Sequence, residues 1–445
     1  MPRRRKRDII IKGFSKLLKE DKLKIVSELM DNQLEAMDLM KSFWHNDQSK
    51  QKVFDEFSEN TISNFYIPYG VAPNVVVNGR NHLVPLVIEE SSVVAAASSS
   101  ARFWSERGGF HAEVIDDIKI GQLHFLWKGK MKKFQGIFEE VKQYLRGAAS
   151  DITANMESRG GGIVDMELID MTSEIENYYQ IRVSFNTVDS MGANFINSCL
   201  EEFAGALQSF CRNNNSFTKQ EKECQIIMSI LSNYTPDCLV KAWVECSLDE
   251  LENVDKDLTG QEFAEKFALA VKIAEVDTYR ATTHNKGIFN GVDAVAIATG
   301  NDFRAIEAAG HTYAARDGKY RSLSHVEIKD GKFKYFLTIP LAMGTVGGLT
   351  SLHPLAKHSL EMLGKPSAKE LMMITASLGL ANNFAAIRSL VTKGIQIGHM
   401  KMHLMNILNH FDATKAEKAK AVEYFVVHKV TFSNVSKFMQ EMRGN

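Results

Sequence analysis

Cysteine is scarce in this chain, and its spacing fits neither a disulfide framework nor a metal site. The five cysteines are Cys199, Cys211, Cys224, Cys238 and Cys246. Their number is odd, none belongs to a CxxC pair, and no histidine stands at a spacing typical of zinc ligands. We therefore expect no disulfide framework and no bound metal. The same usage is typical of a reducing compartment, which predicts a cytoplasmic protein.

Net charge and long apolar runs are also missing. The formal net charge is −1, so no global field attracts nucleic acid or an anionic membrane. No run approaches the ~20 apolar residues of a membrane span, and the N-terminal MPRRRKRDIIIKGF lacks the apolar core of a signal peptide. We expect neither a nucleic-acid nor a membrane partner, and we interpret the basic residues 3–7 as a solvated tail.

The common nucleotide and hydrolase motifs are absent as well. The sequence contains no GxGxxG, no P-loop, no HExxH and no GxSxG. The usual dinucleotide and triphosphate sites therefore have no support in the sequence.

What the chain does contain is length, an ordinary composition and clear periodic patterns. Its 445 residues allow two or three domains, and 44% hydrophobic residues are ample for a sizeable core. Helical spacing is expected at 14–43, 131–157, 261–277 and 367–391, and hairpins around Asn78-Gly79 and Asp330-Gly331. Strands and helices alternate between 117 and 234, which suggests a small α+β domain inserted into a larger one.

One stretch, THNKGIFNGVDAVAIATGND, is mostly apolar or small but carries Lys286 and ends on Asp302. Buried charges are costly unless they are paired, so the two could form a structural ion pair or belong to an active site. Glu90, just before an expected helix, could simply favour the positive helix terminus. His399 could be one surface histidine among 13.

Taken together, these residues lie in five motifs that occur in a fixed order. The motifs are EESSVVAAAS, DSMGAN, YRATTHNKGIFNGVDAVAIATGNDFRA, GTVGGLTSLHPLAKHSL and GIQIGHM. In this order they resemble the class II, bacterial-type 3-hydroxy-3-methylglutaryl-CoA (HMG-CoA) reductases over about 89–403. Two departures stand out: Ser190 replaces the alanine of the usual DAMGAN, and Ser91 replaces the proline of the usual EEPS.

The resemblance implies an α+β fold in several parts. A large mixed α/β domain would bind the substrate through residues 1–116 and 235–394. A small inserted domain at 117–234, ferredoxin-like and not a Rossmann fold, would bind the nucleotide. Residues 395–445 would form a helical flap. It also implies a homodimer, or a higher oligomer, with active sites at the dimer interface.

The resemblance also assigns site residues. The implied catalytic residues are Glu90, Lys286, Asp302 and His399. The implied contacts to the hydroxymethylglutaryl group are Ser92, Arg280 and Asn290. The implied nucleotide contacts are Asp165 of GGGIVD and Asp189, Gly192 and Asn194 of DSMGAN. Lys12 and Lys16 match loosely to contacts with the CoA phosphates.

The implied reaction is the four-electron reduction of HMG-CoA to mevalonate and CoA by two NAD(P)H. We expect Lys286 to stabilise the thioester oxyanion, with Asp302 keeping it charged. Either Glu90 or Lys286 would supply the proton in each step. His399 would protonate the leaving thiolate. NADPH suits a biosynthetic role, whereas a carboxylate such as Asp165 near the ribose would favour NADH. The alternatives are the reverse, oxidative reaction, a non-redox CoA-thioester lyase or transferase, and a scaffold that has lost catalysis.

Overall fold

The computed structural model describes residues 10–392, 404–426 and 428–444, and within them the chain is a mixed α/β protein. Its strands form three sheets in which every ladder is antiparallel. Both expected hairpins are confirmed. Asn78 and Gly79, with φ of 49° and 79°, and Asp330 and Gly331, with φ of 51° and 72°, make the turns. Such left-handed pairs match the right-handed twist of the strands they join.

Two of the sheets share one hydrophobic core with a set of helices. The strands are β1 (Tyr69–Val77), β2 (Arg80–Val87), β3 (His111–Val114), β8 (Leu239–Ser247), β9 (Ser324–Lys329) and β10 (Lys332–Pro340). The helices are α5 (Ser91–Ser105), α10 (Gly260–Val276), α11 (Thr278–Ala298), α12 (Phe303–Ala314), α13 (Leu349–Leu352), α14 (Pro354–Met362) and α15 (Ala368–Val391), with the short η2 (Asp249–Leu251). At the centre of the core, Phe384 packs against Trp104 and Phe267.

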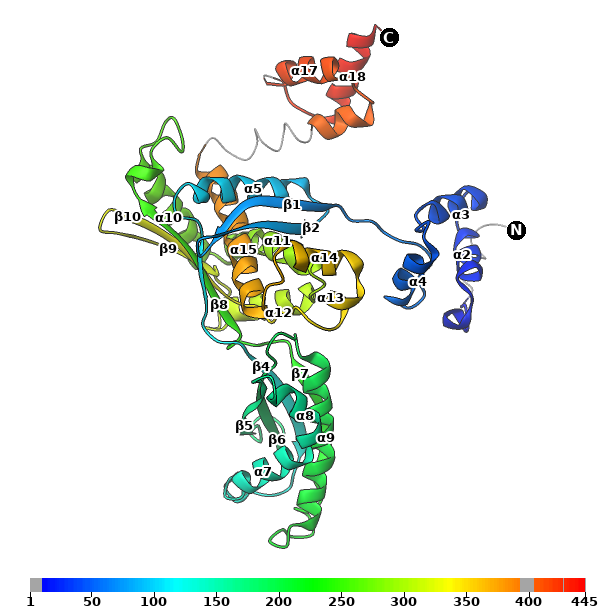
Figure 1. Ribbon diagram of the computed structural model, residues 1–445, viewed down its shortest axis with the longest axis vertical. Coiled ribbons are helices and arrows are strands. Elements are labelled where there is room, and N and C mark those ends of the chain that lie inside the picture. Colours follow the sequence, from blue (N-terminus) through cyan, green and yellow to red (C-terminus); the bar gives the residue numbers. More distant parts are fainter. Residues whose placement is uncertain (1–9, 393–403, 427, 445) are drawn as a thin grey trace.

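Helix α15 runs through the middle of this core (Figure 1). Among the described residues it is the one helix long and apolar enough to span a membrane, but 83% of its apolar window is buried inside the protein. Its apolar surface therefore faces other parts of the chain, as in the core helix of a globular protein. From the sequence we expected no segment with the length and apolar composition of a membrane span, and α15 was missed by that expectation.

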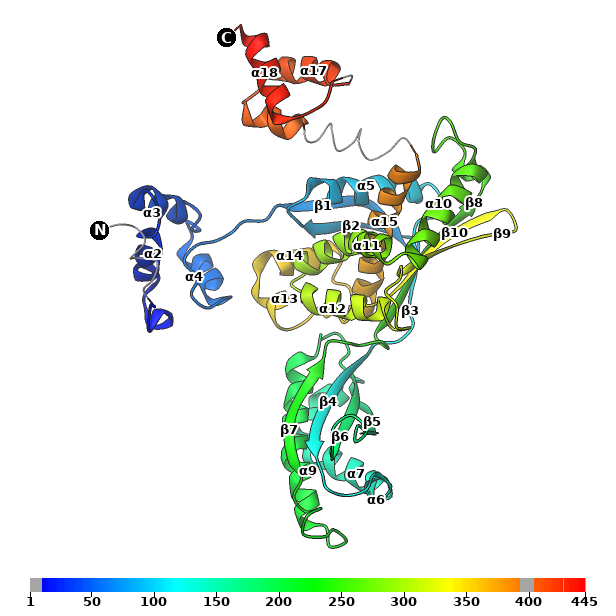
Figure 2. The same ribbon diagram turned by 180° about the vertical axis from the view of Figure 1, so that it is seen from behind.

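The third sheet, ordered β5-β6-β4-β7, has a hydrophobic core of its own around Phe125, Trp127 and Phe203. Its strands are β4 (Ile118–Leu126), β5 (Gly162–Asp170), β6 (Tyr178–Asn186) and β7 (Gln225–Ser232). Its helices are α6 (Met131–Gln135), α7 (Phe138–Ala148), α8 (Ser150–Glu157) and α9 (Ala193–Asn213). Both ribbon views show this part set apart from the other sheets (Figures 1 and 2).

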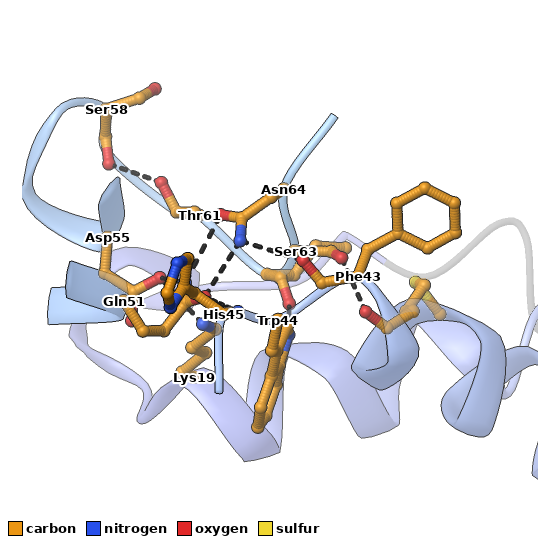
Figure 3. A network of polar contacts seen from close by, with 12 residues as sticks. Lys19, Phe43, Trp44, His45, Gln51, Asp55, Ser58, Thr61, Ser63 and Asn64 are labelled. Carbon is orange, nitrogen blue, oxygen red and sulfur yellow. Dashed lines mark hydrogen bonds and ion pairs between the residues drawn. The ribbon is translucent and has the colours of Figure 1, made fainter. Parts of the chain in front are cut away.

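Short helices stand at either end of the chain. The N-terminal ones are η1 (Phe14–Lys16), α2 (Lys19–Ser27), α3 (Gln33–Ser42) and α4 (Gln48–Glu56). A polar network joins them: Lys19 pairs with Asp55 at 2.7 Å, and Gln51 Nε2 donates to Asp55 and to Asn64 Oδ1 (Figure 3). At the other end, α17 (Lys415–Tyr424) and α18 (Phe432–Arg443) share a small cluster around Leu408 and Phe425.

Candidate active site

Glu90, Ser92 and Lys286 come together where β2 leads into α5. Glu90 is the N-cap residue of α5, and Lys286 lies in the middle of α11, which packs on β2 and α5. Lys286 Nζ stands 3.6 Å from Glu90 Oε2, with 63% and 42% of the two side chains exposed. The hydroxyl of Ser92 donates to the other carboxylate oxygen of Glu90. The structure thus brings a cation, a carboxylate and a hydroxyl to one partly open surface.

The two predicted residues on either side of Lys286 share its helix. Asn290 lies one turn further along α11, where side chains four residues apart face the same way. Arg280 lies in the first turn of α11 and is half-buried, and this burial lowers the pKa of its guanidinium. Lys286 and Asn290 are therefore presented by one rigid element.

Asp302 does not pair with Lys286 within the chain, contrary to expectation. Its Oδ1 caps α12, accepting from the main-chain amides of Arg304 and Ala305 at 3.1 and 3.2 Å, and lies 3.3 Å from Arg304 Nε. The reason is that the stretch between the two residues is helical. Ala298 stands 12 residues beyond Lys286 on α11, and a rise of ~1.5 Å per residue separates them by ~18 Å.

Asp302 instead lines a cavity of about 720 Å³. Most of its wall comes from three segments, 190–195, 300–304 and 344–350, and the rest from Met156 and Arg159. Gly192 and Asn194 lie in this wall, as their motif predicts, and so does Arg304. The cavity therefore joins the DSMGAN and ATGND motifs, which stand far apart in the sequence.

The cavity is suited to an anionic ligand. Gly192 is the N-cap of α9 and makes no side-chain cap, so no side chain at that position competes with a ligand for the first main-chain amides of the helix. Gly192 has φ of 90°, and a Cβ there would stand 2.4 Å from Thr187 Cγ2, so a side chain would not fit. Arg159 and Arg304 add two guanidinium groups to the wall.

The cavity wall is held by hydrogen bonds between the motifs. The side chain of Asn301 donates to Gly344 O at 3.1 Å and accepts from Gly344 N at 2.8 Å. Asp189 Oδ1 accepts from the amide of Ala368 at 2.8 Å, and its carbonyl accepts from Thr345 N at 2.8 Å. Asp189 thus ties the DSMGAN turn to the glycine loop and to α15, and it is not part of the cavity wall.

Two further predicted residues lie elsewhere. Asp165 is exposed on β5 and does not line the cavity; a main-chain hydrogen bond from Met166 and the ammonium of Lys142, 3.2 Å away, lower its pKa. His399 falls outside the described residues. Sequence reasoning did not select Arg159 and Arg304, although Arg159 directly precedes the glycines of GGGIVD and Arg304 follows ATGND. An arginine beside a glycine turn was the available signal.

Comparison with known proteins gives a consistent result. A family model described as hydroxymethylglutaryl-coenzyme A reductase matches residues 19–404. Among curated proteins, a 3-hydroxy-3-methylglutaryl-coenzyme A reductase from Archaeoglobus fulgidus is 37% identical over 94% of this chain and 90% of its own. A probable reductase of the same name from Borreliella burgdorferi is 31% identical over 90% of this chain and 88% of its own.

Solved structures agree with these sequence matches. A 3-hydroxy-3-methylglutaryl-coenzyme A reductase from Streptococcus pneumoniae is 34% identical, covers 98% of this chain and 100% of its own, and superimposes with a TM-score of 0.70. A class II enzyme from the same organism, bound to NADPH in open conformations, is 36% identical over 86% of this chain and 100% of its own, with a TM-score of 0.69.

Proposed function

Because the chain belongs to the hydroxymethylglutaryl-coenzyme A reductase family, we propose that it reduces HMG-CoA to mevalonate and CoA with two NADPH. The observation that carries this proposal is the Glu90–Lys286 pair, 3.6 Å apart, in a chain that the family model matches from 19 to 404. A thioester reductase needs a cation for the oxyanion and a nearby proton donor, and this pair supplies both.

Lys286 is the group that faces the substrate carbonyl in this proposal. Negative charge grows on the carbonyl oxygen as the thioester is reduced, and a preorganised ammonium stabilises it. Glu90 keeps Lys286 charged and fixed in direction, and Ser92 holds the carboxylate of Glu90 in turn. Glu90 can serve the second reduction in its other protonation state: once it has taken a proton from solvent, it can donate that proton to the aldehyde oxygen. His399 remains the proposed acid for the departing thiolate.

The 720 Å³ cavity is the proposed nucleotide site. When bound, the nicotinamide supplies the hydride, and the chain supplies binding and orientation. The open N-terminus of α9 suits the pyrophosphate, and Arg159 suits a 2′-phosphate. The NADPH-bound neighbour supports this choice of cofactor. Asp165 does not oppose it, because that carboxylate is paired with Lys142 and lies outside the cavity wall.

The proposed organisation follows the separate hydrophobic cores. Residues 117–234 form the nucleotide-binding domain, residues 1–116 and 235–394 the substrate domain, and residues 395–445 the flap. We further propose a homodimer in which Asp302 of one subunit faces Lys286 of the other. The separation of ~18 Å along α11 and the exposure of Lys286 support a site that two chains complete together.

One assay tests the function: loss of NADPH absorbance when HMG-CoA is added to the protein. We expect oxidation of two NADPH for each mevalonate formed. A lyase or transferase would consume HMG-CoA without oxidising NADPH, and that result would overturn the proposal. Repeating the assay with NADH compares the two apparent affinities, and running it with mevalonate, CoA and NADP⁺ measures the reverse direction.

A further inference from the structure

Lys119, the second residue of β4, is a buried cation with no protein partner. Its side chain is 2% exposed, and its Nζ has no hydrogen-bond partner among the residues that the structure describes. Burying an unpaired ammonium costs several kcal/mol, so such a group is normally matched by an opposite charge. Lys119 belongs to none of the motifs used above, and it does not line the 720 Å³ cavity.

The neighbouring carboxylates are engaged elsewhere. Asp117 accepts from Asn186 Nδ2 at 3.0 Å and pairs with Lys369 Nζ at 3.2 Å. Asp116 accepts from the main-chain amide of Asp117 at 2.7 Å. The charge of Asp117 is therefore balanced by Lys369, and no carboxylate within the described chain forms an ion pair with Lys119.

A second unpaired donor faces the same space. Thr235 is 2% exposed, and its hydroxyl also lacks a partner in the described part of the chain. Lys119 and Thr235 line one small cavity of about 20 Å³, together with Ser232 and Asn233 at the end of β7. The hydroxyl oxygen of Ser232 already accepts from Tyr234 N at 3.1 Å, which leaves its hydrogen free to donate. Donors therefore dominate the polar lining.

The helix that borders the cavity adds further positive potential. Ala193, the first residue of α9, is part of the lining, and the 21-residue helix has no side-chain cap at Gly192. The positive end of the α9 dipole thus lies beside the ammonium of Lys119. The rest of the lining is apolar: Met191, Ile196, Leu231, Ala305 and Ala342.

We propose that this cavity binds a monovalent, monatomic anion of the halide class, held by Lys119 and Thr235. The ammonium is unsuited to a metal cation, and a cavity of about 20 Å³ is closer in size to a single monatomic ion than to phosphate or a carboxylate ligand. Water would satisfy the donors but leave the charge of Lys119 unmatched, whereas a halide does both. The ion would join the ends of β4 and β7 to α12, at Ala305, behind the wall of the larger cavity.

Bromide is the probe that locates the ion. Crystals of the protein grown with sodium bromide should show an anomalous peak within hydrogen-bond distance of both Lys119 Nζ and Thr235 Oγ1. Crystals of Lys119→Met, which keeps an unbranched side chain one atom shorter and removes the charge, should show no peak there. A water without anomalous signal at this position in the native protein would overturn the proposal.

Thermal unfolding gives an independent test in solution. Replacing gluconate by bromide at constant ionic strength should raise the Tm of the native protein in proportion to the logarithm of bromide concentration, because a ligand that binds only the folded state stabilises it. Lys119→Met should lose this response. Lys219→Met, which removes an exposed lysine outside the cavity lining, should keep it.

Thr235→Val keeps the proposal testable if the Lys119→Met variant does not fold. It removes one donor and keeps both the shape and the charge, so a given rise in Tm should need a several-fold higher bromide concentration. An unchanged bromide response in Thr235→Val, or a native response in a folded Lys119→Met, would show that the ion binds elsewhere. Neither measurement uses substrate or cofactor, so the outcome is independent of the proposed catalytic function.

Discussion

At the scale of single residues, Lys286 carries the sharpest expectation. Replacing it with alanine removes the proposed oxyanion cation, and loss of one such group lowers kcat by about 10²–10³-fold or more. Because the side chain is 63% exposed, the variant should keep a native circular dichroism spectrum and Tm. NADPH oxidation with HMG-CoA measures the loss. Lys272→Ala, which removes an exposed lysine paired with Glu275 on α10, is the control and should keep full activity.

A second prediction at the scale of single residues concerns Asp293 and the dependence of stability on pH. Burial, followed by the charge of Glu307 and a hydrogen bond to it, raises the pKa of the Asp293 carboxyl, and its Oδ1 has no partner among the described residues. The folded protein therefore keeps a proton that the unfolded chain releases near pH ~4. The stability that this proton contributes is complete below that pH and is lost as the pH rises toward the folded pKa.

Asp293→Asn, which stays neutral at every pH, tests whether stability falls as the pH rises because of Asp293. Between pH 5 and 8 its free energy of unfolding should rise relative to the native protein, by at most about 1.4 kcal/mol per pH unit. Denaturant unfolding at several pH values measures the difference. The same substitution at the exposed Asp237 should give a difference that does not change with pH. A constant difference for Asp293→Asn as well would contradict a raised pKa.

At the scale of elements, the start of α9 depends on one glycine. Gly192 has φ of 90°, and a Cβ would stand 2.4 Å from Thr187 Cγ2. Gly192→Ala should therefore cost about 1–3 kcal/mol of stability and raise KM for NADPH more than KM for HMG-CoA. Gly205→Ala, in the middle of the same helix with nothing within 4 Å of its Cβ, should be neutral or slightly stabilising. Equal effects on both KM values would remove Gly192 from the nucleotide site.

Elements with strong local signals could be predicted from sequence, and those set by packing could not. Asn78-Gly79 and Asp330-Gly331 specified both hairpins because left-handed turns need such residues. Helix α11 was not recognised, since its glycines could equally make turns or admit substrate. Gly291 in fact lies inside the helix, where a Cβ would stand 2.5 Å from Leu378 O of α15. That glycine permits close helix packing, and a contact with a residue so distant in the sequence leaves no local signal.

The same limit applied to the candidate site. Glu90, Lys286 and Gly192 were assigned through the resemblance of their motifs to those of a known family. The structure places Glu90 beside Lys286, and Gly192 in the cavity wall. The pairing of Lys286 with Glu90 instead of Asp302 could not be foreseen, since it depends on α11 being a continuous helix. The buried Lys119 was equally hidden, because its burial results from how β4, β7 and α9 meet. Partners across the fold are a property of tertiary structure.

At the scale of the whole molecule, the positions of the two proposed catalytic charges, Lys286 on α11 and Asp302 at the N-cap of α12, are best explained by two subunits. Within one chain Lys286 pairs with Glu90, while Asp302 lines the 720 Å³ cavity with Arg304. If each active site takes Lys286 from one subunit and Asp302 from the other, a heterodimer of two different inactive variants contains one site with both groups intact. If both groups act within one chain, such a mixture contains no intact site.

Mixing Lys286→Ala with Asp302→Ala therefore distinguishes the two arrangements. After the mixed subunits have been unfolded and refolded together, half of random dimers are heterodimers, and each has one intact site of two. The mixture should recover about a quarter of native activity, because a single deleted charge otherwise lowers kcat by orders of magnitude. Sedimentation equilibrium confirms the dimer in the same samples. Activity no higher than that of either variant alone would place both charges in one chain.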